Sequence, residues 1–149
     1  ISVPASFSSS NSSPIFFDVM TVGMLSTALI LSVMSLPSEL WIRIPLANSY
    51  AWRKYRTFWL HLDAPRHYYL HTITSMEILT KNSNLKINDI IFDSTEYSLT
   101  ESEKYFRNIE FSPNQKIFTK KKINAFKKEA KRLNAINDGD TACFYISKA

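Results

Sequence analysis

The chain places all three of its histidines in one stretch of thirteen residues, WLHLDAPRHYYLH, at residues 59–71. The same stretch holds an aspartate, an arginine and three aromatic residues. An imidazole titrates near neutral pH and can accept a proton, a carboxylate can orient the imidazole, and a guanidinium can bind an acidic group through paired hydrogen bonds. These residue types within one short stretch predict a site for acid-base chemistry.

The same residues also have a structural interpretation. Asp63-Ala-Pro65 is typical of a turn that the aspartate caps, and a histidine or arginine in a loop often bonds backbone carbonyls. Both interpretations stay open for Asp63 and Pro65. His71 is expected only to approach the helix that follows it.

Length and composition indicate one compact domain of ordinary globular type. The chain has 149 residues, of which 45% are hydrophobic and 21% charged. Its single cysteine, Cys143, cannot form an internal disulfide, which favours a cytosolic setting, and no Cys/His spacing resembles a metal site. Its two glycines, Gly23 and Gly139, are too far apart to form a glycine-rich loop.

The net charge of +5 is unevenly distributed, because seven of the 18 basic residues fall within residues 120–132, where Glu129 is the only acidic residue. These residues alternate with an apolar helical face formed by Ile123, Phe126, Ala130 and Leu133. The pattern predicts a helix over residues 119–134, solvated on its basic side. Contact with a polyanion or an anionic membrane is the alternative, and nucleic acid is not the expected partner.

The N-terminal region combines a polar lead with an apolar run. Residues 1–14 are serine-rich and are expected to be disordered. Residues 15–22 fit a buried strand, followed by a helix-compatible segment. Residues 19–36 carry no charge, so a short transmembrane helix is the alternative, although Asp18 and several hydroxyl residues weaken it.

The remaining elements follow in alternating order. Strands are predicted at residues 39–45, 86–94 and 141–148, with a long loop after the first of them. Capping-box spacings at Thr74 and Thr100 predict helices that start there. This order indicates an α/β domain with a mainly parallel sheet, in which ligands bind beyond the carboxyl ends of the strands, where residues 59–71 would lie.

The segments IRIPLANSYAW and WLHLDAPRHYYLHTITSMEILTKNSNLKINDIIFDSTEY resemble the C-terminal half of class I S-adenosylmethionine-dependent methyltransferases. The similarity is to a bacterial group with an LDAPRH-like loop after the fifth strand, and it is strongest over residues 42–105. It implies a truncated Rossmann-like methyltransferase fold over residues 15–149, with the family's strands four to seven and an antiparallel last strand. Exposed strand edges would then favour self-association.

The resemblance implies S-adenosylmethionine as cofactor, but the sequence departs from the family's pattern. The glycine-rich loop would lie before Ile1, and Leu36-Pro-Ser-Glu39 stands where a Lys-Pro-Gly-Gly-like turn is usual. We therefore expect weak or absent cofactor binding and activity from this chain alone, so that enzyme status stays uncertain. A non-enzymatic basic binding module and a membrane-anchored protein remain alternative functions.

On this resemblance the chemistry is methyl transfer to a small-molecule or sugar-linked acceptor, which needs positioning and a base. The expected catalytic residues are His67, Asp63 and Arg66. The expected acceptor-binding residues share an aromatic or imidazole ring, and they are Trp59, His61, Tyr68 and Tyr69. The sequence identifies no cofactor-binding residue and no metal ligand.

Overall fold

The computed structural model describes residues 15–17, 39–63, 67–109 and 117–149. The expected lead, most of the first predicted strand and the uncharged run at 19–36 lie outside these residues, as does Arg66. Within the described parts, no helix is long and apolar enough to cross a membrane.

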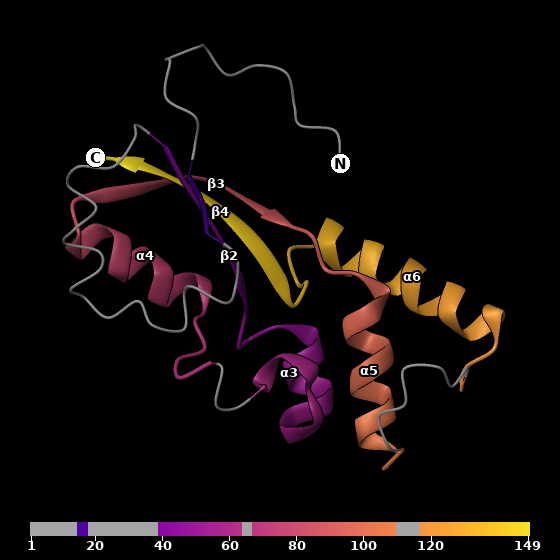
Figure 1. Ribbon diagram of the computed structural model, residues 1–149. Coiled ribbons are helices and arrows are strands. Elements are labelled where there is room, and N and C mark those ends of the chain that lie inside the picture. Colours follow the sequence, from indigo (N-terminus) through magenta and orange to yellow (C-terminus); the bar gives the residue numbers. More distant parts are fainter. Residues whose placement is uncertain (1–14, 18–38, 64–66, 110–116) are drawn as a thin grey trace.

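A four-stranded sheet has the order β1-β2-β4-β3 (Figure 1). Strand β1 (Ile15–Phe17) pairs in parallel with β2 (Glu39–Pro45). Strand β4 (Thr141–Lys148) lies between β2 and β3 (Leu85–Phe92) and is antiparallel to both. The prediction of an antiparallel last strand is confirmed. The prediction of a mainly parallel sheet is wrong for the hydrogen-bonded pairs, because β4 lies between β2 and β3 and runs opposite to both.

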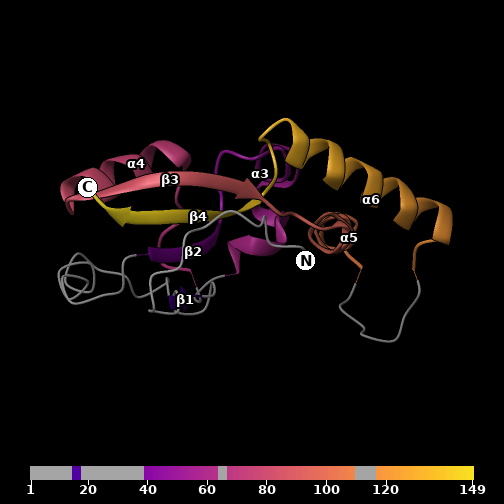
Figure 2. The same ribbon diagram turned by 90° about the horizontal axis from the view of Figure 1, so that it is seen from above.

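One face of the sheet packs on helix α4 (Ile73–Asn82), which lies along that face in Figure 2. Alternate residues of β2 are buried, as expected for a strand with one face in a core. The core side chains come from β2, from Leu46 directly after it, from β4 and from α4: Leu40, Ile42, Ile44, Leu46, Ala142, Phe144, Ile146 and Met76. Burial of each large aliphatic side chain contributes about 1.5–3 kcal/mol.

A second core lies beyond the carboxyl end of β2, where three helices meet (Figure 1). These are α3 (Tyr50–Tyr55), α5 (Glu96–Phe106) and α6 (Lys120–Ala135). The buried side chains of this core are Ala51, Tyr55, Leu99, Phe126, Ala130 and Leu133 from the helices, together with Trp59 from the segment after α3. The predicted basic helix is confirmed, with Phe126, Ala130 and Leu133 facing this core while Ile123 is exposed.

Two predicted helix starts are wrong. Helix α4 is capped by Thr72, whose hydroxyl accepts from Ser75 N at 3.1 Å while Ser75 Oγ accepts from Thr72 N at 2.8 Å. This pair uses the same spacing two residues before the predicted one. Helix α5 begins at Glu96, and the Thr100 hydroxyl instead donates to the Glu96 carbonyl at 2.7 Å inside the helix.

The prediction of a long loop after β2 is also wrong. This segment contains α3 and two 3-10 turns, η2 (Arg56–Phe58) and η3 (Leu60–Leu62). Ser49 caps α3 by accepting from Trp52 N at 3.3 Å. A helix of six residues gains little from propensity, so its burial against α5 and α6 accounts for it.

Candidate active site at the carboxyl edge of the sheet

The histidine-containing stretch lies where the sequence predicts it, beyond the carboxyl end of β2. Leu46 forms a parallel bridge with His71, and Ala47 N donates to the His71 carbonyl at 2.9 Å. Leu46 N donates to the Asp140 carbonyl at 2.9 Å. The end of β2, the stretch and the start of β4 therefore meet at one edge.

Asp140 is the buried acceptor at the centre of this edge, with 3% of its surface exposed. Its Oδ2 accepts a hydrogen bond from Trp59 Nε1 at 2.9 Å and another from the Ser98 hydroxyl. A buried carboxylate without partners would be strongly destabilising, and these two donors satisfy it. Asp140 thereby ties α5 and the histidine-containing stretch to the start of β4.

His61 lies beside this carboxylate, with Nε2 at 3.8 Å from Asp140 Oδ2. Its ring meets the Trp59 ring edge to face at 5.7 Å. Burial lowers the pKa of His61 below its ordinary value of 6.5, while the charge of Asp140 opposes that shift. The charges of Arg43 and His67 lower the pKa further and that of Asp63 raises it. The lowered pKa favours the neutral imidazole at pH 7, the form that can accept a proton.

An ion pair between Arg43 and Asp93 lies at the same edge of the sheet. Arg43 Nε donates to Asp93 Oδ2 at 2.6 Å, and Arg43 Nη2 reaches Thr141 Oγ1 at 3.5 Å. The Ser94 hydroxyl accepts from Thr141 N at 3.0 Å. The other oxygen of Asp93, Oδ1, is buried and accepts no hydrogen bond from any residue that the structure describes.

The other predicted site residues have different surroundings. Trp59 is 2% exposed and belongs to the helical core, whereas Tyr68 and Tyr69 are 71% and 72% exposed. Asp63 is exposed with a φ of 25°, a backbone conformation typical of turns, and His67 is half-buried. The structure thus brings Trp59 and His61 together and leaves the two tyrosines on the surface, so a shared acceptor-binding role stays a prediction.

Sequence reasoning missed Asp140 and Ser98. Asn137-Asp-Gly-Asp140 carries a turn signal, and its last aspartate comes directly before the final strand. An antiparallel last strand begins at the edge where β2 ends, so its first residues belong to the site. That combination of position and strand direction is the signal that could have identified Asp140.

A second buried carboxylate, Glu103, lies on α5. Its Oε2 accepts from the Tyr55 hydroxyl at 3.0 Å, and its Oε1 accepts from Arg107 Nε at 2.8 Å and Nη2 at 2.6 Å. Burial alone would raise the pKa of Glu103, but the hydrogen bonds from Arg107 and Tyr55 and the charge of Lys54 outweigh burial and lower it. This network anchors α3 to α5 behind the candidate site.

Replacing Glu103 with glutamine should lower the free energy of unfolding at neutral pH by roughly 1–3 kcal/mol, because hydrogen bonds to a charged acceptor are lost. The folded-state pKa is lowered, so the contribution is complete above the unfolded pKa and disappears as pH falls through the folded value. Urea unfolding at a series of pH values should therefore show the gap between the two proteins closing in acid. Glu77→Gln, at an exposed position on α4, is the control, and a gap that stays constant with pH would contradict the prediction.

Gly139 is the one glycine among the described residues, and its surroundings are closed. A glycine-rich loop lets the backbone approach a ligand closely. Gly23 lies outside the described residues, and a Cβ added at Gly139 would lie 2.5 Å from Asn134 Oδ1 and 2.7 Å from Ser94 Oγ. Side chains therefore already fill the space beside Gly139. The described residues include no cluster of metal-ligating side chains.

Comparison with known proteins finds similarity among solved structures. No family model matches the chain, and no curated protein matches it. The crystal structure of a SAM dependent methyltransferase from Archaeoglobus fulgidus is similar, with a TM-score of 0.44 and 17% sequence identity. The match covers 91% of this chain and 58% of that one, so the chain spans little more than half the length of the similar protein.

Proposed function

We propose that the chain carries the acceptor side of an S-adenosylmethionine-dependent methyltransferase of Rossmann-like fold. The acceptor is a hydroxyl or amine of a small or sugar-linked molecule. Two features support the family: the sequence resemblance over residues 42–105, and a last strand that runs antiparallel, as the resemblance implies.

The observation that carries the proposal is the pair of His61 and Asp140 at the carboxyl edge. The negative charge of Asp140 favours the neutral tautomer that carries its proton on Nε2, which leaves the lone pair of Nδ1 as the proton acceptor. Because the pKa of His61 is lowered, this neutral form predominates at pH 7. His61 is therefore the base in this proposal.

The proton moves from the acceptor's hydroxyl or amine to His61 Nδ1, which makes the acceptor atom a nucleophile. Asp63, Arg66 and His67, which follow His61 in the sequence, hold the acceptor in this proposal, and His67 is the alternative base. Tyr68 and Tyr69 are exposed and available to cover a bound acceptor.

Methyl incorporation tests the proposal. The purified chain is incubated with S-adenosylmethionine labelled on its methyl group and a panel of hydroxylated, amine-bearing and sugar-linked small molecules. We expect slow, saturable labelling of at least one acceptor class, with a rate that falls in acid as His61 becomes protonated. Labelling whose rate does not fall in acid would overturn the proposal. So would the absence of labelled product from a chain that is folded by circular dichroism and binds S-adenosylmethionine in a calorimetric titration.

A further inference from the structure

Helix α6 presents a face of five lysines on the side opposite its buried residues. Successive residues of an α-helix are rotated by about 100°, so residues that are four or seven positions apart lie on the same side of the helix and form a row. Lys120, Lys127 and Lys131 form one row, and Lys121 and Lys128 form a second row beside it. All five are exposed, and we call them the lysine face.

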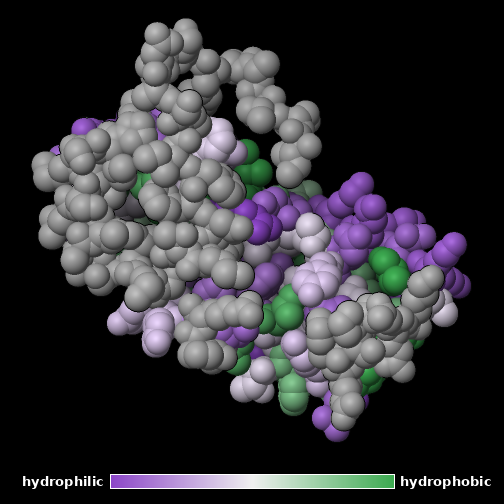
Figure 3. All heavy atoms as spheres, viewed as in Figure 1, coloured by the Kyte–Doolittle hydropathy of each residue, from purple (hydrophilic) through white to green (hydrophobic). Residues whose placement is uncertain are grey.

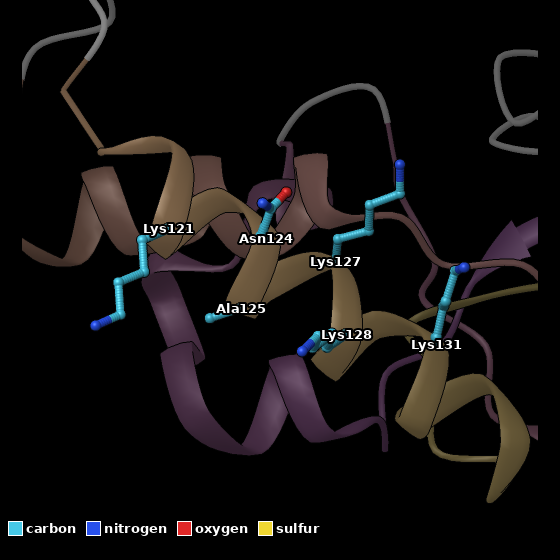
Figure 4. A pocket seen from close by; sticks show the side chains of 6 residues that line it. All are labelled: Lys121, Asn124, Ala125, Lys127, Lys128 and Lys131. Atoms are coloured by element: carbon cyan, nitrogen blue, oxygen red, sulfur yellow. The ribbon is translucent and has the colours of Figure 1, made fainter.

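The rows flank Asn124, as Figure 4 shows for four of these lysines. There Lys127 and Lys131 extend to one side of α6, and Lys121 and Lys128 extend to the other. Together with Asn124 and Ala125 they line a hollow of about 710 Å³. Figure 3 shows hydrophilic side chains gathered over this helix.

The positive charge of this face is not neutralised by the described residues. Glu129 pairs with Arg132, Nη2 to Oε1 at 2.8 Å, and no described carboxylate forms an ion pair with the five lysines. Lys122 lies apart from them, with its Nζ 4.9 Å from the centre of the Phe126 ring. A dense and uncompensated row of cations attracts a polyanion.

The dimensions of the face favour an extended array of phosphates over a single small anion. From residue 120 to residue 131 the α-helix rises about 16 Å. Along the axis of a duplex, each strand has one phosphate for every rise of about 3.4 Å. Several consecutive phosphates therefore fit along one row. A mononucleotide or an inorganic anion would leave most of the lysines without a partner.

Two competing partners fit the face less well. Interfacial helices insert an apolar side into lipid, but Phe126, Ala130 and Leu133 of α6 are buried in the protein core. Proteins that grip single strands stack bases on aromatic side chains, and the lysine face contains no aromatic residue. Lysines without stacking partners suit the backbone of a double helix, which they contact without reading its sequence.

We propose that the lysine face binds the phosphate backbone of double-stranded nucleic acid independently of sequence. This is a second function, separate from methyl transfer and located on a different surface. It takes up the alternative of contact with a polyanion, and it revises the sequence-based expectation that nucleic acid is not the partner.

The test is fluorescence anisotropy of the purified 149-residue chain with a labelled duplex DNA of about 20 base pairs, over a series of salt concentrations. If four or five phosphates are neutralised, the logarithm of the association constant should fall with the logarithm of salt with a slope of roughly −4. The double variant Lys121→Gln/Lys128→Gln should reduce the steepness of that slope by about 2, and Lys127→Gln/Lys131→Gln should do the same.

Lys81→Gln/Lys86→Gln is the matched control, because it removes the same charge from exposed positions on α4 and β3. It should leave the slope unchanged, and circular dichroism checks that every variant is folded. The proposal is overturned if the control weakens binding as much as the lysine-face variants do, or if duplex binding does not depend on salt. It is also overturned if a matched single strand, or vesicles of phosphatidylglycerol and phosphatidylcholine, bind more tightly than the duplex.

Discussion

Replacing His61 with asparagine should lower the rate of methyl transfer by about 10²–10⁴, the usual contribution of a positioned base. Asparagine keeps a hydrogen-bonding amide close to Asp140 but cannot take up a proton. In the parent protein the rate should rise with pH through the lowered pKa of His61 and then level off. The rate that remains in His61→Asn should lose this dependence. Steady-state rates across the pH range, measured on the best acceptor from the incorporation assay, check both statements.

His71→Asn is the matched control for this experiment. Burial also lowers the pKa of His71, but its Nδ1 lies 3.3 Å from Ser75 Oγ at the start of α4 rather than beside Asp140. His71→Asn should therefore keep the parent rate and pH profile. Equal losses in the two variants would refute the assignment of His61 as base, and a loss confined to His67→Asn would transfer that role to His67.

Asp140→Asn separates the charge of the pair from its packing. Asparagine keeps an oxygen that can accept from Trp59 and Ser98, but it removes the negative charge that raises the pKa of His61. The acid limb of the pH profile should therefore move to lower pH, which NMR titration of the His61 ring can follow without any acceptor. An unmoved His61 titration would show that Asp140 acts only in packing.

The parts of the fold that could be predicted are those in which local pattern and tertiary environment agree. The bounds of β2 and β4 follow from apolar runs with clear stops, and α6 follows from three buried residues at helical spacing. The helix starts failed because the spacing at Thr72 competes with the one at Thr74, and only packing decides between them. Helix α3 is too short to show a period, and the capping residue Ser49 by itself does not predict a helix.

The sequence predicted where the candidate site lies in the fold, but it did not predict all the residues that form it. The order of the elements predicted that residues 59–71 follow β2 at its carboxyl end, and the described part of this stretch lies at that edge. Asp140 is 79 positions from His61 in the numbering of the chain, and the reversed strand β4 brings the two together. Local spacing cannot reveal such a pair, because the contact depends on strand order.

Replacing Trp59 with alanine should lower the free energy of unfolding by about 3–5 kcal/mol, the usual cost of removing a large aromatic side chain from a core. Trp59 is 2% exposed, and its ring meets the Trp52 ring edge to face at 5.9 Å. The variant also removes one of the two donors that satisfy buried Asp140. Urea unfolding followed by circular dichroism measures the loss. Tyr68→Ala, at a position 71% exposed, should change stability by less than about 0.5 kcal/mol.

Trp59→Phe distinguishes the packing of the indole from its hydrogen bond. Phenylalanine fills much of the same space but has no N–H, so the expected loss of about 1–3 kcal/mol comes mainly from the unsatisfied carboxylate. Removing that carboxylate as well should recover part of the loss, so Trp59→Phe combined with Asp140→Asn should be less destabilised than the two single variants predict together. Additive losses would mean that the indole contributes through packing alone. Asp140 would then depend on Ser98, and the stability of the fold would not be coupled to the proposed base through Trp59.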